Sequence, residues 1–383
     1  MKFKYFIPTK VYFGKGEVER VGSLSKRFGK KAFIITGKKS AKESGLLDRV
    51  TGLLEKNGIL YEIFNETIPN PPVQLVEKGG EKFLSTSSDF IIAIGGGSPM
   101  DLSKGIGIYS VYKEIIPFLL GEKRVERKIP PLIAIPTTSG TGSEVTRYAV
   151  LTYEGRKLAV GSEYIFPDVA LVDPETTLSM PKELSRDTGM DALSHALEGL
   201  FSLKANSVSD SLAYESIRII FDFLPRSVFH EEDFEAREMM HYASMVAGMV
   251  IAETGTGLVH SMGYPLTMKY GFPHGLANAI IMPYVMKYNI PACYEKMANV
   301  VRIISEYSGI DIEDAYLLPE VLLDMNELLE IPITLEEAGV DEKDFEKFAR
   351  EVMDSMQKKP IPRKPNRIDE IISIYQESFY GLI

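Results

Sequence analysis

The chain has only one cysteine, Cys293, among its 383 residues, and it has no tryptophan. A single thiol cannot build a disulfide framework or a cysteine-based metal cluster, so both kinds of site are excluded. Such sparse cysteine usage is typical of a reducing compartment. The first eight residues also contain no apolar segment like that of a secretory signal, so we expect a cytoplasmic protein.

Long apolar runs and an excess of positive charge are missing as well. No stretch reaches the ~18 consecutive apolar residues of a membrane-spanning helix, so no membrane partner is expected. The net charge is −10, whereas proteins that bind nucleic-acid phosphates usually present a basic field. We therefore expect no nucleic-acid partner, while small anions stay open as ligands because helix N-termini and local lysines can hold them.

Strand-like and helix-like segments alternate over the first half of the chain. Short β-branched or aromatic runs between turn formers predict strands and one hairpin, at residues 31–36, 60–64, 89–94, 131–135, 168–173 and, for the hairpin, 148–160. Amphipathic spacing predicts helices at 46–54 and 73–84. Apolar strands separated by helices indicate a parallel sheet covered on both faces, an α/β domain.

The strand signal nearly vanishes after about residue 181. Long periodic segments follow and suit an all-helical domain, at residues 186–202, 208–224, 234–253, 294–308, 312–329, 341–356 and 368–380. The proline-rich, basic stretch 358–365 predicts a surface loop before the last helix. We therefore expect two domains, residues 1–182 and residues 183–383.

A glycine-rich loop follows the predicted strand at 89–94. Gly95, Gly96 and Gly97 lead through Ser98 into a helix that contains Asp101. Glycines let backbone N–H groups approach a phosphate, and a helix N-terminus favours negative charge. Because ligands bind at strand ends in doubly wound sheets, the loop predicts dinucleotide binding. It matches neither common glycine fingerprint, so a plain tight turn remains the alternative.

Two further loops follow predicted strands. Residues 136–144 are rich in hydroxyl groups, and Thr137 and Thr138 could wrap a pyrophosphate or a ribose; an ordinary loop has the same composition. After the first strand come Gly37, Lys38, Lys39 and Ser40, with no acidic residue to bond a ribose 2′-hydroxyl. This set favours NADP over NAD, with solvated turn lysines as the alternative.

The five histidines all lie in the second half of the chain. Asp191 and His195 stand four residues apart on a predicted helix, so both side chains can reach one cation. His260 sits in an apolar, small-residue helix and His274 in a Pro–Gly turn, where an imidazole needs a partner such as a metal. One carboxylate and three imidazoles suit a divalent transition metal and leave room for a substrate oxygen. The other two histidines fit solvated or structural positions: His230 and His241.

Together these segments resemble the iron-containing (group III) metal-dependent alcohol dehydrogenase family over essentially the whole chain. The most specific parts are residues 95–101, 136–144, 189–198 and 257–275. The resemblance implies a Rossmann-like dinucleotide-binding domain at 1–182 and an all-helical metal-binding domain at 183–383, the fold also seen in dehydroquinate synthase. It implies a homodimer and a divalent metal, iron first and zinc as the alternative, held by Asp191, His195, His260 and His274.

The same resemblance places nucleotide contacts and shows two departures. The implied contacts are Gly97, Ser98, Thr137, Thr138, Lys157 and Asn70, with Asp101 and Leu178 at positions that often line the cofactor. Tyr264 stands where many members carry a further histidine, so it either shapes the catalytic pocket or only packs. Gly37 replaces the acidic residue of NAD-preferring members, which agrees with NADP.

We predict an NADP(H)-dependent alcohol dehydrogenase or aldehyde reductase, with NAD as the other nucleotide. Hydride passes between the nicotinamide and an alcohol–aldehyde pair while the metal acts as a Lewis acid on the substrate oxygen. The alternatives are an NAD-dependent polyol dehydrogenase of the glycerol-dehydrogenase type, a lyase of the dehydroquinate-synthase type, a metal-dependent hydrolase, and a non-catalytic metal-stabilised nucleotide-binding protein. The lyase would need several basic residues beside Asp191, His260 or His274, and the sequence has no such cluster there.

Overall fold

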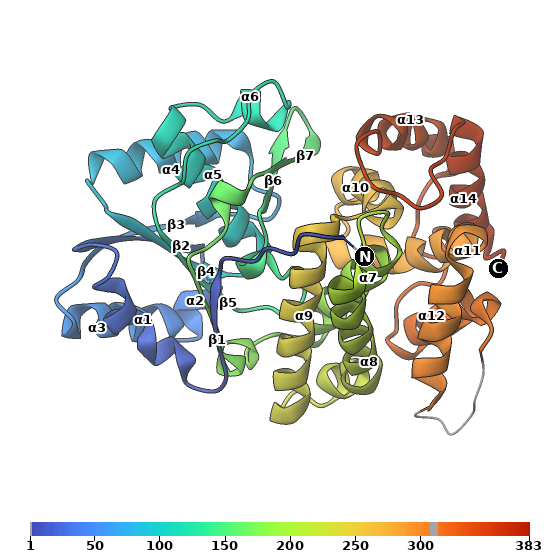
Figure 1. Ribbon diagram of the computed structural model, residues 1–383, viewed down its shortest axis with the longest axis horizontal. Helices are drawn as coiled ribbons and strands as arrows, with labels where there is room; N and C mark the ends of the chain where they lie inside the picture. The colour runs from blue at the N-terminus through green and yellow to red at the C-terminus, as the bar shows by residue number, and fades with distance from the viewer. Residues whose placement is uncertain (1, 307–312) are drawn as a thin grey trace. The chain divides into compact units, whose positions relative to one another are not determined.

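Six parallel strands form the sheet of the N-terminal half (Figure 1). The computed structural model describes residues 2–306 and 313–383. The spatial order of the strands is β1 (Lys10–Phe13), β8 (Val169–Val172), β5 (Leu132–Pro136), β4 (Phe90–Gly95), β2 (Lys31–Gly37) and β3 (Leu60–Thr67). All five pairings are parallel, so the carboxyl ends of the strands meet at one edge.

Alternate residues of the central strands face two separate apolar layers. Phe33 and Ile91 point to a layer shared with α4 (Val73–Ser85) and α5 (Gly97–Tyr112). Ile34 and Ile92 point to the opposite layer, shared with α1 (Val21–Ser25) and α3 (Leu46–Lys56). Figure 1 shows these helix pairs on opposite faces of the sheet. Burial on both faces explains why these strands are apolar throughout.

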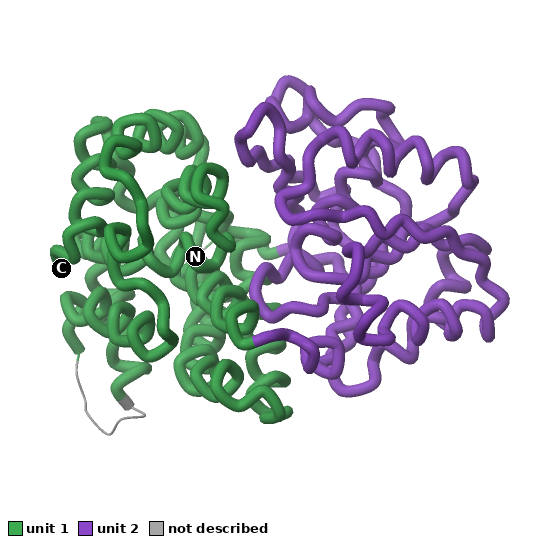
Figure 2. The backbone as a smooth tube through the Cα atoms, turned by 180° about the vertical axis from the view of Figure 1, so that it is seen from behind, with its two compact units in different colours: residues 1–5, 182–383 green, residues 6–181 purple. Residues whose placement is uncertain are grey.

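Smaller elements complete this half. They are α2 (Ser40–Glu43), α6 (Ile116–Leu119), an antiparallel hairpin of β6 (Tyr148–Tyr153) and β7 (Arg156–Gly161), and short 3-10 turns that include Ser143–Val145 and Pro174–Thr177. The chain divides into two compact units, shown in Figure 2. We call residues 6–181 the sheet unit, and residues 182–383 with the N-terminal segment up to Tyr5 the helical unit.

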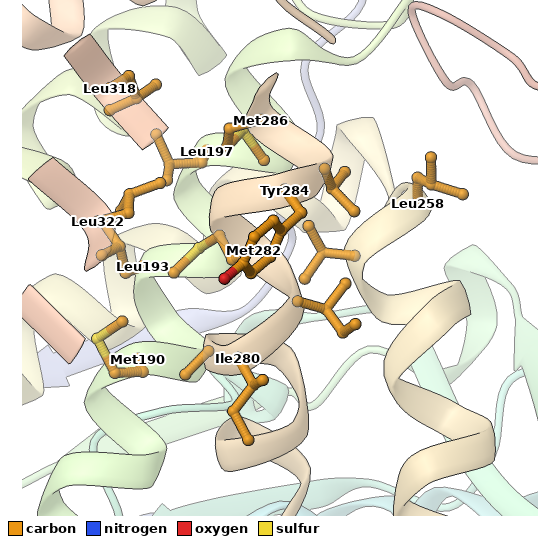
Figure 3. Packing of buried hydrophobic residues seen from close by; sticks show 14 of the residues in the cluster. Met190, Leu193, Leu197, Leu258, Ile280, Met282, Tyr284, Met286, Leu318 and Leu322 are labelled. Carbon is orange, nitrogen blue, oxygen red and sulfur yellow. The ribbon is translucent and has the colours of Figure 1, made fainter. Parts of the chain in front are cut away.

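The described part of the helical unit is built on long helices. They are α7 (Lys182–Phe201), α8 (Ser207–Phe229), α9 (Phe234–Thr254), α10 (Leu258–Tyr270), α11 (His274–Glu306), α12 (Leu318–Leu328), α13 (Phe345–Ser355) and α14 (Ile368–Tyr380). Figure 3 shows the core they share, in which Leu193 and Leu197 of α7 lie among Met282 and Tyr284 of α11. This packing fixes the two helices that later carry candidate metal ligands.

Most predicted elements are confirmed, and three points need correction. Strand β1, a four-residue strand at the sheet edge, was not predicted. His274 does not lie in a turn, because it is the first residue of α11, directly after Pro273. The helix predicted to begin at 294 is the second part of α11, which bends at Cys293. Parts of the helices predicted at 294–308 and 312–329 fall on 307–312, outside the described residues.

No helix within residues 2–306 and 313–383 is by itself long and apolar enough to cross a membrane. Only α9 and α10 taken together meet the length and composition, and the two are bent by 108° relative to each other.

Candidate metal centre and nucleotide-binding loops

The candidate metal ligands come from three helices of the helical unit. Asp191 and His195 lie one turn apart on the buried middle of α7. His260 belongs to the first turn of α10 and His274 begins α11. The ligand atoms of Asp191, His195 and His260 all lie within 4.8 Å of one another. The structure therefore brings together three candidates that are up to 69 residues apart in the sequence (260 minus 191).

Three imidazoles face the same carboxylate oxygen. The distances to Asp191 Oδ1 are 3.6 Å from His260 Nε2, 4.0 Å from His195 Nε2 and 3.9 Å from His274 Nε2. His274 is the outer member, with a side chain that is 25% exposed while the others are almost fully buried. Two ligands that bind one ion at ~2.1 Å and a tetrahedral angle lie roughly 3.4 Å apart. The observed separations are slightly wider and fit a shared ion.

The nitrogen of His260 that faces Asp191 provides a further test of fit. Among the described residues, His260 Nε2 is buried without a hydrogen-bond partner. A buried polar nitrogen beside a carboxylate, yet too far away to bond it, is costly unless a cation lies between them. Nitrogen and oxygen donors of this kind suit iron or zinc. The residues present therefore fit a divalent transition metal.

Neighbouring side chains hold this cluster in place. Asn278, one turn after His274 on α11, donates from Nδ2 to Asp191 Oδ1 at 2.9 Å. Its Nδ2 also lies 3.4 Å from His274 Nε2. Tyr264 stacks on the His274 ring at a centroid distance of 5.3 Å. Asn278 was not predicted from the sequence, although its spacing from His274 identifies it once that histidine is placed on a helix.

Glu198 is a second group near the metal ligands that was not predicted from the sequence. It follows His195 by three residues on α7, and its Oε2 lies 2.6 Å from His260 Nδ1. Burial raises the pKa of Glu198, but the charge and hydrogen bond of His260, with the charge of Lys359, outweigh burial and hold that pKa below its usual value. Glu198 Oε1 also accepts from Val259 N–H at 2.6 Å, so both carboxyl oxygens lie within hydrogen-bond distance of nitrogen atoms on α10.

The glycine loop and the hydroxyl loop of the sheet unit lie against each other. Gly95 pairs with Pro136 at the ends of β4 and β5, and Thr137 N–H donates to Gly95 O at 3.1 Å. A Cβ on Gly96 would lie 2.8 Å from Thr138 Oγ1. The two loops are thus neighbours at the carboxyl ends of adjacent strands, as expected for a nucleotide-binding edge. Gly97 and Ser98 begin α5 beside them.

A buried lysine on α5, the helix that follows the glycine loop, holds the end of the hydroxyl loop. Lys104 Nζ on α5 donates to Ser143 O, Ser143 Oγ, Thr146 Oγ1 and Tyr148 O at 2.7 to 3.1 Å. Asp101 accepts from Ser143 Oγ at 2.8 Å. Burial raises the pKa of Asp101 and lowers that of Lys104 to about 8. Asp101 is therefore part of a loop-supporting network, and Lys104 is a member of it that was not predicted.

The remaining predicted nucleotide residues are also at or near this edge. Asn70 O accepts from Thr152 Oγ1 at 3.0 Å, and Thr152 pairs with Lys157 in the β6–β7 hairpin. Leu178 follows the turn after β8 and is 45% exposed. Gly37 and Lys38 line a surface pocket at the end of β2 together with Lys42, Tyr61 and Asn65. Among the described residues, Lys39 and Ser40 are exposed and are not part of that lining.

Fold and site define a class of protein, and comparisons with known proteins identify the family. A parallel sheet with glycine and hydroxyl loops, joined to a helical unit with a buried Asp–His cluster, is the architecture of a metal-dependent α/β-plus-helical enzyme. The family model for iron-containing alcohol dehydrogenase matches residues 8–174. The model for the C-terminal domain of Fe-containing alcohol dehydrogenases matches residues 185–379.

Similar proteins cover nearly all of the chain. An NADPH-dependent butanol dehydrogenase of Clostridium saccharobutylicum is 36% identical, over 99% of this chain and 98% of its own length. An NAD-dependent methanol dehydrogenase of Bacillus methanolicus is 36% identical, over 94% and 95%. The crystal structure of a 1,3-propanediol oxidoreductase superposes with a TM-score of 0.92 at 34% identity, covering 99% of this chain and 100% of that one.

This chain belongs to the iron-containing alcohol dehydrogenase family. It is an NAD(P)-dependent, metal-dependent oxidoreductase of alcohols and aldehydes, and the resemblance noted from the sequence is confirmed. The predicted fold, a parallel-sheet domain followed by a helical domain, is confirmed as well. The polyol-dehydrogenase and non-catalytic alternatives are not favoured by these matches.

Proposed function

We propose that the chain is an NADP(H)-linked alcohol dehydrogenase or aldehyde reductase that transfers a hydride between the nucleotide and an alcohol–aldehyde pair. The observation that carries this proposal is the convergence of three imidazole Nε2 atoms on Asp191 Oδ1. Asp191, His195, His260 and His274 are the proposed ligands of a divalent metal, iron first and zinc as the alternative. Residues 1–182 are proposed to bind the dinucleotide and residues 183–383 to bind the metal.

The metal, the nucleotide and the chain's own residues have separate tasks. When bound, the metal supplies Lewis-acid polarisation of the substrate oxygen, and the nicotinamide supplies or accepts the hydride. The four proposed ligands hold the ion, and the buried apolar surroundings of α7 and α10 keep water away from it. The glycine and hydroxyl loops present backbone N–H and hydroxyl groups to the nucleotide phosphates. Tyr264, stacked on His274, is proposed to shape the substrate pocket.

Cofactor choice is proposed from the end of β2. Gly37 leaves space where an acidic side chain would repel a 2′-phosphate, and Lys38 lines the adjacent pocket. The exposed Lys39 and Ser40 lie next in the chain and could contact the same phosphate. The NADPH-dependent butanol dehydrogenase supports this proposal, and the NAD-dependent methanol dehydrogenase names the alternative.

We further propose a cytoplasmic homodimer. The single cysteine, which is buried and unpaired in the structure, is in keeping with a reducing compartment. Light scattering on a size-exclusion column measures the assembly, and a mass of one chain would exclude the dimer.

The test of the proposed function combines metal content with nucleotide absorbance. The purified protein should contain about one iron or zinc per chain, and short aldehydes should oxidise NADPH in its presence. His274→Ala should lower metal content after dialysis by at least ~10-fold, because one ligand is lost. The matched control is His230→Ala, since His230 is exposed at the end of α8. Full metal content in His274→Ala would contradict the ligand set, and bound NADPH without turnover on any aldehyde would contradict the enzyme.

A further inference from the structure

Glu198 uses both of its carboxylate oxygens to join two helices. It lies on α7, seven residues after Asp191 and three after His195, so all three side chains share one face of that helix. Oε1 accepts from Val259 N–H at 2.6 Å, and Oε2 pairs with His260 Nδ1 at 2.6 Å. The side chain is 3% exposed. The carboxylate therefore caps the first turn of α10 and contacts a proposed metal ligand at the same time.

The surroundings of Glu198 are built to keep a carboxylate there. A Cβ on Gly257 would lie 2.9 Å from Glu198 Oε1, so a larger residue at 257 would crowd the oxygen. Lys359 brings a positive charge close to the Glu198 carboxylate. Its Nζ donates to Gly257 O at 3.2 Å and, in a weaker bond, to Thr256 Oγ1 at 3.4 Å. A buried negative charge needs such compensation.

These contacts determine which nitrogen of His260 carries the proton. Oε1 already accepts from the Val259 backbone, and Oε2 as an acceptor at 2.6 Å requires Nδ1 to be the N–H nitrogen. In the neutral imidazole Nε2 then has a lone pair, and this is the atom 3.6 Å from Asp191 Oδ1. A metal-binding imidazole in proteins generally donates its second N–H to a carboxylate or carbonyl in this way.

We propose that Glu198 is a positioning residue that fixes the tautomer and ring orientation of His260, so that Nε2 is presented to the metal. This inference rests on the proposed function, because it takes His260 to be a ligand. Lys359 supports the arrangement as a partly buried counter-charge of Glu198. The reaction itself involves neither side chain directly.

Glu198→Gln is the discriminating substitution because it keeps the shape and changes the bonding. An amide has one acceptor oxygen and one donor nitrogen. If its oxygen keeps the bond to Val259 N–H, its NH₂ group faces His260 Nδ1 and requires that nitrogen to accept. The proton of His260 then moves to Nε2, which cannot bind a metal. We expect metal affinity to fall roughly 10- to 100-fold, measured by competition with a chromophoric chelator.

Three controls separate a positioning role from a general structural role. Glu183→Gln, an exposed change in the first turn of the same helix, should leave metal affinity unchanged. NADPH binding by Glu198→Gln should stay within about 2-fold of wild type, a change of only ~0.4 kcal/mol. Excess metal should restore kcat, which it would not do for a misfolded site. Wild-type metal affinity in Glu198→Gln would overturn the proposal.

The outcome also distinguishes this inference from the proposed function. If His260→Ala keeps its metal, the ligand set itself fails; if His260→Ala loses metal while Glu198→Gln does not, only the role of Glu198 fails. Should Glu198→Gln not fold, ¹⁵N NMR of the wild-type, zinc-loaded protein gives the answer. A protonated Nδ1 and a metal-bound Nε2 on His260 are expected, and the reverse assignment would overturn the proposal.

Discussion

Gly275→Ala is expected to displace a metal ligand without touching any ligand side chain. Gly275 is the second residue of α11, directly after His274, and a Cβ there would lie 1.7 Å from Asp187 O. An ordinary contact begins at 3.4 Å, so the shortfall is 1.7 Å (3.4 minus 1.7). Both partners of this clash belong to helix backbones, so no rotamer change can relieve it. The N-terminus of α11 or the middle of α7 must move by more than 1 Å.

A movement of this size breaks the contacts that join α11 to Asp191. The bond from Asn278 Nδ2 to Asp191 Oδ1 is 2.9 Å long, and lengthening by more than 1 Å abolishes it. His274 moves with the same turn, and metal sites tolerate only about 0.2 Å of error in ligand distance. We expect at least the roughly 10- to 100-fold loss of metal affinity that follows loss of a supporting partner. Overpacking should cost about 1–3 kcal/mol of stability in addition.

The assay compares two glycine-to-alanine variants under identical conditions. Metal affinity is measured by chelator competition, and thermal unfolding is followed with and without added metal. The matched control is Gly52→Ala in the interior of α3, where a Cβ would meet nothing within 4 Å. It should keep its metal and gain roughly 0.5–1 kcal/mol from helix propensity. Wild-type metal affinity in Gly275→Ala would show that the close approach of α7 and α11 does not position the ligands.

Two further predictions concern the sheet unit. Burial raises the pKa of Glu144 to about 7, so the folded chain holds a proton on Glu144 that the unfolded chain releases above pH 4.5. The stability that this proton contributes is complete below pH 4.5. It is lost as the pH rises through 7, and the loss amounts to about 3 kcal/mol. Glu144→Gln should therefore become more stable relative to wild type between pH 5 and pH 8 in urea unfolding, and a constant difference would contradict this. Gly37→Asp should raise KM for NADPH and lower it for NADH, because a carboxylate repels a 2′-phosphate and bonds a free 2′-hydroxyl. Unchanged KM values would show that Gly37 does not determine the choice between the two nucleotides.

Local sequence patterns were sufficient to predict most of the sheet unit. Strands β2, β4 and β5 are short apolar runs that end in glycine or proline, and their burial on both faces makes them easy to recognise. Strand β1 escaped prediction because it is four residues long, partly exposed and at the sheet edge. Its apolar residues favour a strand, but so short a run shows no clear period, and its pairing partner β8 lies more than 150 residues away in sequence.

The helix from His274 to Cys293 was the main omission in the helical unit. Pro273, Gly275, Pro283 and Pro291 are residues that normally interrupt helices, so local rules predict turns there. Tertiary packing overrides those rules, because α11 lies in the middle of the apolar core shown in Figure 3. The same omission hid Asn278, since its relation to His274 exists only on a helix.

The stretch 358–365 illustrates a different difficulty. Its prolines and basic residues predict a surface loop, and it does lie before α14. Yet Ile361 is only 2% exposed, Pro360 O accepts from Leu203 N–H, and Lys359 lies over the Tyr264 ring at 5.3 Å. Composition indicates that such a segment is not regular structure, but it cannot indicate what the segment packs against.

The metal cluster combines a local rule with a non-local one. Each of three helices contributes a histidine ligand and a supporting group about one turn further along. The pairs are His195 with Glu198 on α7, His260 with Tyr264 on α10, and His274 with Asn278 on α11. The sequence reveals such pairs by their spacing. That the pairs face one another depends on close helix contacts, and glycines permit them: a Cβ would lie 2.9 Å from Glu198 Oε1 at Gly257, 2.3 Å from Asn278 Oδ1 at Gly263, and 1.7 Å from Asp187 O at Gly275. Each of these glycines lies within three residues of a proposed ligand, so small residues beside a candidate ligand are the sequence feature that indicates where helices converge on an ion.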